Sequence, residues 1–236
     1  MSNLFNLILY QPLFNGLIIL YNSIAFRDLG AAIIILTIII RLILAPFFHR
    51  SLKQQKALQS LTPHIKKIQE EHKNNKEKQT QAMLELYRAH GVNPLSSIYL
   101  LLIQFPILYA LYRVFLNGLN NKEFSLLYSF VSRPTVLDHS LFGLMNLQSP
   151  SVFIAILAAA AQYFQGLLAV PKAHPGEKLG QAEMMAKNMA IFMAGFTFII
   201  LFRFPSALGL YWLTTALFSL AQQIIVNRAS VAEVKN

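Results

Sequence analysis

Residues 28–48, DLGAAIIILTIIIRLILAPFF, carry the strongest indication of the fold class. It is apolar almost throughout, and its length matches the roughly 20 residues that a helix needs to cross the hydrocarbon core of a bilayer. Arg41 stands inside it, after a run of aliphatic residues that Thr37 interrupts. We therefore predict a first transmembrane helix over residues 28–48 that carries a charge within the membrane.

Similar apolar blocks occupy residues 95–117, 150–170 and 188–227. The last block is too long for one span, and Pro205-Ser206 predicts a turn that divides it into spans 188–204 and 206–227. Of the 236 residues, 55% are hydrophobic and only 13% are charged, and the mean hydropathy is +0.47. This composition excludes an ordinary soluble domain and a disordered chain. We expect an all-α integral membrane protein, a bundle of five transmembrane helices with a cytoplasmic helical hairpin and an N-terminal interfacial helix.

The basic residues are distributed unevenly between alternate loops. Of the 20 Lys and Arg residues, 14 fall in residues 49–94, 171–187 and 228–236, and three fall in residues 1–27 and 118–149. The positive-inside rule places the first group of segments in the cytoplasm and the second group outside. The chain is thus expected to have its N-terminus outside and its C-terminus in the cytoplasm. The net charge of +10 is explained mainly by topology, and no DNA partner is expected.

The N-terminal segment leaves two alternatives open. Residues 4–24 are apolar but contain five interruptions, at Asn6, Gln11, Pro12, Asn15 and Asn22. They form either an interfacial helix within an extracytoplasmic segment 1–27 or a sixth span that would place Met1 inside. We favour the interfacial helix because polar groups are costly in hydrocarbon. The segment lacks the basic start and small-residue cleavage site of a secretory signal.

The long cytoplasmic segment 49–94 predicts a helical hairpin. Leu58, Leu61, Ile65 and Ile68 repeat at helical spacing, Asn74-Asn75 marks a turn, and Gly91 with Pro94 ends the returning helix. The apolar stripe is thin, so we expect a mobile helical pair that projects into water. Most of its charges form a solvated surface, and a share is expected to contact lipid phosphates or ribosomal RNA.

Arg41 lies about three residues beyond the midpoint of its span, or ~4–5 Å toward the cytoplasm. A charge at this depth costs at least ~2.5 kcal/mol unless it meets water or a partner. Of the ten acidic residues only Asp28, at the very start of the first span, falls within a predicted span, and none lies near the depth of Arg41, so a buried ion pair is excluded by inventory. Two interpretations remain: Arg41 extends to the cytoplasmic interface, or it faces a water-filled cavity within the bundle.

Other polar residues inside the spans favour the cavity. In addition to Thr37 and Arg41, the candidates are Gln104, Gln162, Gln165, Trp212, Thr215, Ser219 and Gln222. The glutamines and Arg41 all fall on the cytoplasmic side of centre, although scattered interhelical hydrogen bonds are the simpler explanation for any one of them. Together they predict a hydrated concavity that opens to the cytoplasm. The outer halves of the spans are apolar, and no selectivity filter, inverted repeat, phosphate loop, metal site or catalytic set is evident. We expect neither an enzyme nor a cofactor.

Four stretches carry a resemblance to a known family. They are LGAAIIILTIIIRLILAP (29–46), QSLTP through ELYRAHGVNP (59–94), QFPILYALY (104–112), and FPSALGLYW (204–212) followed by Gln222-Gln223. In this order the chain resembles the YidC/Albino/oxidase-assembly family of membrane protein insertases, in its short five-span bacterial form, from about residue 12 to residue 228. It departs from the family pattern at Ser96-Ser97-Ile98-Tyr99, Ala207 and Ala216.

The resemblance implies insertion and folding of other membrane proteins, alone or beside the Sec translocon, in a bacterial plasma (inner) membrane. Its implied partners are nascent membrane proteins, the lipid bilayer, the ribosome and the Sec translocon. In this view Arg41 holds an acidic or polar client segment, and the client's apolar span moves along Thr37, Tyr211 and Trp212 into lipid. The alternatives are a small transporter or channel and a membrane assembly chaperone without insertion activity.

Overall fold

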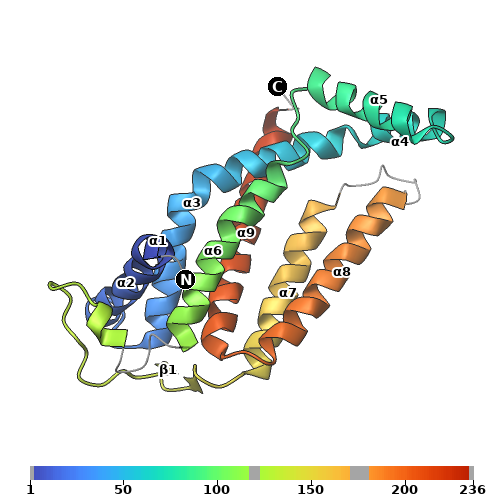
Figure 1. The fold of residues 1–236 in the computed structure, drawn as a ribbon. Coiled ribbons are helices and arrows are strands. Elements are labelled where there is room, and N and C mark those ends of the chain that lie inside the picture. Colours follow the sequence, from blue (N-terminus) through green and yellow to red (C-terminus); the bar gives the residue numbers. More distant parts are fainter. Residues whose placement is uncertain (1–2, 117–122, 171–180, 234–236) are drawn as a thin grey trace.

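The computed structural model describes residues 3–116, 123–170 and 181–233. Five long helices run side by side: α3 (Leu29–Ser60), α6 (Ser96–Leu116), α7 (Val152–Ala169), α8 (Gln181–Leu201) and α9 (Ser206–Glu233) (Figure 1). Among the described residues, five helical stretches are long and apolar enough to cross a membrane: Asn3–Asn22, Leu29–Ser60, Val152–Ala169, Met184–Leu201 and Ser206–Asn227. Helix α6 adds the apolar stretch Leu102–Leu116. The expected all-α membrane bundle is confirmed.

Helix α9 is the centre of the bundle. It packs against α3 on one side and against α7 on another, while α8 packs mainly on α7. Small residues permit these close contacts, as is usual between membrane helices. A Cβ atom added at Gly209 of α9 would lie 2.7 Å from Cγ2 of Ile154, and one added at Gly166 of α7 would lie 2.7 Å from Cβ of Ala190. The peripheral place of α8 agrees with the composition of its residues 190–201, where Thr197 is the single polar side chain.

Short polar side chains fix where the helices begin. Asp28 caps α3 by accepting a 2.6 Å hydrogen bond from the Ala31 amide, and Ser151 caps α7 through the Ile154 amide. The second carboxylate oxygen of Asp28 accepts from the Phe142 amide, next to the small antiparallel pair β1 (Ser140–Leu141) and β2 (Met145–Asn146). These two strands, and the 3-10 turn η2 (Glu123–Leu126), were not predicted. The strands lie at the end of the bundle where α3 begins, because Asp28, the N-cap of α3, bonds to the Phe142 amide beside them.

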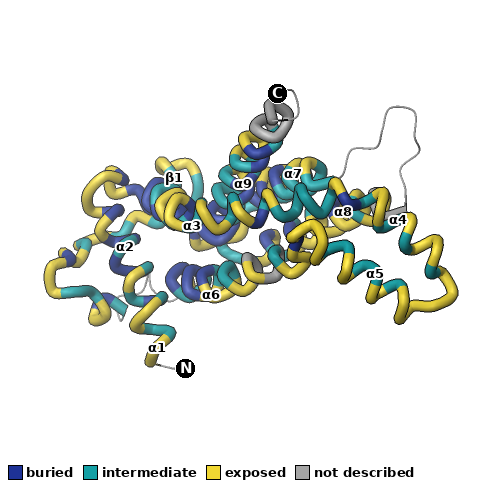
Figure 2. The backbone as a smooth tube through the Cα atoms, turned by 90° about the horizontal axis from the view of Figure 1, so that it is seen from above, coloured by how far each residue is buried: buried dark blue, intermediate teal, exposed yellow. Residues whose placement is uncertain are grey.

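The N-terminal segment forms a helical arm of α1 (Asn3–Phe5), the π-helical turn η1 (Asn6–Tyr10) and α2 (Gln11–Asn22). Figure 2 shows this arm reaching out to one side of the bundle when the molecule is seen from above. Its polar side chains form hydrogen bonds with the loop that follows α6. Asn15 donates to the Leu126 carbonyl and accepts from the Tyr128 amide, and Asn22 donates to the Ser132 carbonyl. The polar interruptions of this segment are therefore anchors for the loop between α6 and α7.

Residues 49–94 differ in one respect from the prediction. Helix α3 continues to Ser60, well past the predicted span, and the hairpin proper consists of α4 (Thr62–Glu71) and α5 (Lys76–Ala89). The expected stripe is thus split, since Leu58 belongs to α3 while Ile65 and Ile68 belong to α4. Pro63 explains the break, because it lacks an N–H group and its ring would clash with the carbonyl of Gln59 in a continuous helix.

The helical pair α4–α5 extends away from the bundle (Figure 1), and neither helix has a buried residue. Asn75 caps α5 by accepting from the Lys78 amide, so the turn lies where the sequence predicts it. Buried Leu61 and Val92 pack at the base, where the chain enters and leaves the hairpin. The pair is consequently attached to the bundle at one end only.

Candidate functional site

Arg41 lies on α3 and is 5% exposed, although no ion pair of this residue occurs among the described residues. Its guanidinium lies over the ring of Phe48, with 4.4 Å between the guanidinium carbon and the ring centroid. Its Nη1 atom is buried and has no hydrogen-bond partner in the described part of the chain. The side chain extends toward the hairpin end of α3, as the first interpretation expects, yet it ends among helices rather than in open solvent. The sequence inventory correctly indicates a buried guanidinium without a carboxylate.

A polar contact between α9 and α6 lies close to Arg41. Tyr211 of α9 is 2% exposed and lies within electrostatic range of Arg41. The Gln104 side-chain amide donates a hydrogen bond to the Tyr211 hydroxyl. Three helices therefore meet at one polar point, α3 with the charge, α9 with a hydroxyl and α6 with an amide. This is the part of the predicted constellation that the structure brings together most closely.

Thr37 is close to this point in sequence but is otherwise engaged. It is 2% exposed, and its hydroxyl donates a 2.6 Å hydrogen bond to the Ile33 carbonyl of its own helix. A hydroxyl bonded four residues back satisfies itself without a neighbour. Thr37 is thus a small buried residue beside the site, and its hydroxyl is bonded within its own helix and not to Arg41.

Trp212 belongs to a different contact, although it follows Tyr211 directly. Its indole N–H donates to Gln162 of α7 over 3.3 Å, so the two neighbouring aromatic residues of α9 bond to different helices. Gln165 is half-buried on α7. Because α9 packs against both α3 and α7, its polar residues serve two interfaces.

Farther along α9, toward the hairpin end, the remaining predicted residues are largely covered. Ser219 is 8% exposed, Thr215 and Gln222 are half-buried, and the Gln222 carbonyl oxygen has no partner among the described residues. These residues extend from Tyr211 toward a second polar cluster. The chain thus carries polar groups along α9 from the middle of the bundle to its hairpin end.

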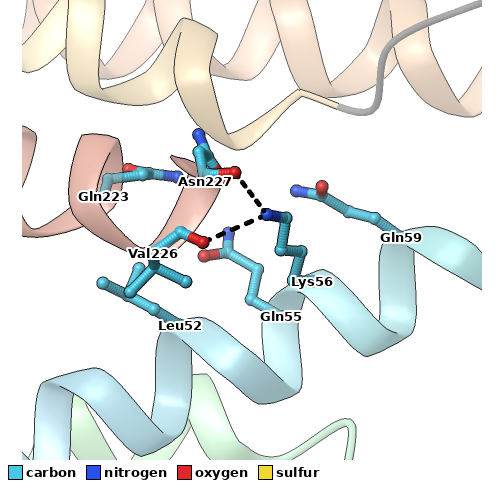
Figure 3. Close-up of a pocket in the computed structure, with 7 residues that line it drawn as sticks. All are labelled: Leu52, Gln55, Lys56, Gln59, Gln223, Val226 and Asn227. Carbon is cyan, nitrogen blue, oxygen red and sulfur yellow. Dashed lines mark hydrogen bonds between the residues drawn. The ribbon is translucent and has the colours of Figure 1, made fainter. Parts of the chain in front are cut away.

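That second cluster was missed by the sequence reading. A small pocket between α3 and α9, about 10 Å³ and so large enough for about one water molecule, is lined by Gln55, Lys56, Gln59, Gln223 and Asn227, with apolar neighbours (Figure 3). The Lys56 ammonium donates to the carbonyls of Val226 and Asn227, at 3.3 and 3.4 Å. The Gln59 amide donates to the Ala169 carbonyl at the end of α7. Lys56 and Gln59 share a helix face, but both fall in the segment 49–94 that the sequence predicts to be the hairpin.

Phe48 is the other residue that sequence reasoning overlooked, since an aromatic residue near a membrane interface needs no special explanation. Here its ring lies against the Arg41 guanidinium. A buried cation–π contact of this kind contributes about 1–2 kcal/mol. It stabilises the charge without supplying a hydrogen-bond acceptor, so the buried Nη1 atom stays available to one.

These features are those of a polytopic α-helical membrane protein whose buried arginine has no counterion within the described ranges of the chain. Residues 19–233 match the sequence model of the family described as the 60Kd inner membrane protein, and the chain belongs to this family. It is a multi-pass bacterial inner membrane protein.

Curated relatives carry the name membrane protein insertase YidC. The protein of Clostridium tetani is 35% identical over 201 residues, covering 84% of this chain and 81% of its own length. The proteins of Campylobacter jejuni and Geobacter sulfurreducens are each 32% identical, covering 94% and 96% of this chain. The chain spans 38% and 39% of the length of these last two relatives.

Proposed function

We propose that this chain is a membrane protein insertase that moves client transmembrane segments from the cytoplasm into the bilayer, with or without the Sec translocon. The family membership and the name of its relatives support this function. The observation that carries the mechanism is Arg41, a buried guanidinium with an unused donor at the meeting point of α3, α6 and α9. A buried donor without an acceptor is costly, so a client that brings a carboxylate or a carbonyl relieves that cost.

In the proposed mechanism the polar residues along α9 receive a client segment from the hairpin end. Arg41 holds an acidic or polar part of the client, which shortens the hydrocarbon path that this part must cross. The client's apolar span then moves along Thr37, Tyr211 and Trp212 into lipid. Burial of about 20 apolar residues, at ~0.8 kcal/mol for each CH₂ group, together with the membrane potential, drives the step. No covalent bond breaks and no cofactor takes part.

The proposed orientation places the hairpin and the C-terminus in the cytoplasm and the N-terminal arm at the outer interface. It rests on the 14 basic residues of one side and on the hydrogen bonds that tie the arm to residues 126–138. Because the chain has no Cys, single cysteines report topology directly. An impermeant maleimide should label Phe26→Cys in intact cells and Lys73→Cys only after permeabilisation. The reverse pattern would overturn the orientation.

The hairpin is proposed as the contact surface for the ribosome and the Sec translocon. Its helices α4 and α5 carry exposed basic residues and are attached to the bundle at their base only. Basic side chains on a mobile element suit the phosphates of ribosomal RNA.

The function is tested by rescue of cells depleted of their own insertase, and by crosslinking. A photoreactive residue at Trp212 should crosslink to a nascent single-span client, whereas one at Phe192, 64% exposed on peripheral α8, should not do so before the client is released. A transporter or channel would instead give solute flux in proteoliposomes without client crosslinks. A chaperone without insertion activity would bind clients yet leave their tails untranslocated.

A further inference from the structure

The two short strands β1 and β2 are joined by a tight turn, and both central residues of this turn have positive φ. The Leu144 amide donates to the Leu141 carbonyl over 2.9 Å, and φ is +50° at Phe142 and +68° at Gly143. This is a type I′ turn, in which Asn-Gly and Asp-Gly are the usual central pairs because both positions adopt the left-handed conformation. Phenylalanine is thus an uncommon residue at the first of these positions.

The turn presents large apolar side chains at its surface. Phe142 is 65% exposed and Leu144 is 87% exposed. The sequence around them is uncharged, because no Lys, Arg, Asp or Glu occurs from residue 139 to residue 171. Turns and exposed strand edges that face water usually carry polar or charged residues. The composition of this turn is therefore unlike that of a turn in water.

Hydrogen bonds hold the turn at the level where two membrane-spanning helices begin. On one side, the Phe142 amide donates to the side chain of Asp28, which is the N-cap of α3, and β1 packs against α3. On the other side, the Ser206 hydroxyl at the start of α9 donates to the Asn146 carbonyl over 3.0 Å. Figure 1 shows β1 at the end of the bundle opposite to α4 and α5. The turn is consequently fixed at the ends of α3 and α9.

The lipid-facing surface of the bundle begins beside this turn. Helix α7 is apolar and long enough to cross the membrane, and its first residues, Val152 and Phe153, are 50% and 63% exposed. The Ser206 amide donates to the Ser149 carbonyl over 2.9 Å, so the chain between β2 and α7 also stays beside the start of α9. The exposed apolar side chains of the turn therefore continue the surface that α7 presents to lipid.

We propose that the turn 141–144 is a membrane anchor that inserts Phe142 and Leu144 into lipid, in the outer leaflet under the orientation proposed above. Insertion removes two large apolar side chains from water, which is the favourable term that an exposed turn of this composition lacks. Because Asp28 joins the turn to α3, the anchor holds the start of this helix at the membrane boundary. Arg41 follows Asp28 by 13 residues, about 20 Å along a helix, so the anchor also sets the depth of the guanidinium.

Nitroxide spin labels on single cysteines test the proposal in the full chain, reconstituted in liposomes of phosphatidylethanolamine and phosphatidylglycerol. Labels at Phe142→Cys and Leu144→Cys should collide more often with oxygen, which concentrates in lipid, than with a water-soluble nickel chelate. Lys73→Cys, in the exposed turn between α4 and α5, should show the reverse, and Phe192→Cys, 64% exposed on α8, gives the lipid reference. Phe142→Asn is the matched variant, because Asn adopts the left-handed conformation readily. It should shift the label at position 144 toward the nickel chelate.

Three outcomes would overturn the proposal. Labels at positions 142 and 144 that collide mainly with the nickel chelate, as the label at position 73 does, would place the turn in water. Labels that neither reagent reaches would show that protein, such as a second copy of this chain, covers the turn. An unchanged label at position 144 in the Phe142→Asn variant would show that Phe142 does not hold the turn in lipid. No client is needed in these measurements, so they stand apart from the test of insertion.

Discussion

Replacement of Arg41 by Met is expected to stabilise the bundle while it impairs insertion. A charge at membrane depth costs at least ~2.5 kcal/mol. Among the described residues the compensation is the Phe48 ring at 4.4 Å, worth about 1–2 kcal/mol, and Nη1 remains unpaired. Met has a similar length and removes both contributions. The free energy of unfolding should therefore rise by about 1 kcal/mol.

Reversible unfolding in mixed micelles measures this change, and Trp212, the single tryptophan, supplies the signal. Arg113→Met is the matched control. Arg113 donates to Asn6 over 2.9 Å and lies over the Tyr10 ring at 4.5 Å, so its loss should destabilise the protein by about 1–3 kcal/mol. The same substitution is thus expected to act in opposite directions at the two sites.

In cells, Arg41→Met should fail to insert clients with acidic translocated tails, and Arg41→Lys should work in part because it retains the charge. If Arg41→Met destabilises the protein as Arg113→Met does, Arg41 is held by a partner and the reasoning is refuted. Full insertion activity of Arg41→Met would refute the electrostatic role while leaving insertion itself intact.

Three further predictions follow from packing, architecture and titration. Gly209→Ala should cost about 1–3 kcal/mol, because its Cβ would lie 2.7 Å from Cγ2 of Ile154; Ile154→Ala should cost less in that background than in the wild type, and equal costs would contradict the contact. Replacement of residues 62–89 by a short linker should reduce insertion while the Trp212 unfolding transition stays unchanged, since α4 and α5 bury no residue in the bundle. Burial lowers the pKa of His139 below its usual 6.5, with Asp138 opposing the shift, so the unfolded chain binds the proton more readily and stability is lost as pH falls below about 6.5. Hydrogen exchange around residues 139–147 at pH 7.5 and 5.5 should show this loss, and His139→Phe should remove it.

The helical character and approximate positions of the long apolar helices could largely be predicted, because long apolar runs have few alternative structures in lipid. The turn at Pro205-Ser206 lies between α8 and α9, and the turn at Asn74-Asn75 lies between α4 and α5. The extent of α3 could not be predicted in the same way. Residues 49–60 have no continuous apolar run that would extend the predicted span. This part of the helix depends on contacts of Lys56 with α9 and of Gln59 with α7.

Which polar residues pair with each other also could not be predicted from the sequence. Gln104 with Tyr211 and Gln162 with Trp212 are contacts between helices distant in the chain. A helical stripe indicates one face, but α9 is covered on more than one side, so adjacent Tyr211 and Trp212 serve different neighbours. The polar residues of the N-terminal arm, which are interruptions in the sequence, become anchors because residues 126–138 supply their carbonyl and amide partners.

Arg41 and Arg113 have similar sequence surroundings but different neighbours in the fold. In the sequence, Arg41 and Arg113 are alike, since each stands in an apolar run with no acid nearby. In the fold, Arg113 donates a hydrogen bond to Asn6 and lies over the Tyr10 ring, and both partners belong to the N-terminal arm. Arg41 lies over the Phe48 ring, and its buried Nη1 atom has no partner among the described residues. The buried Nη1 donor of Arg41 costs free energy as long as it has no acceptor. An acceptor that enters the site removes this cost. That difference is why we place client recognition at Arg41 and structural support at Arg113.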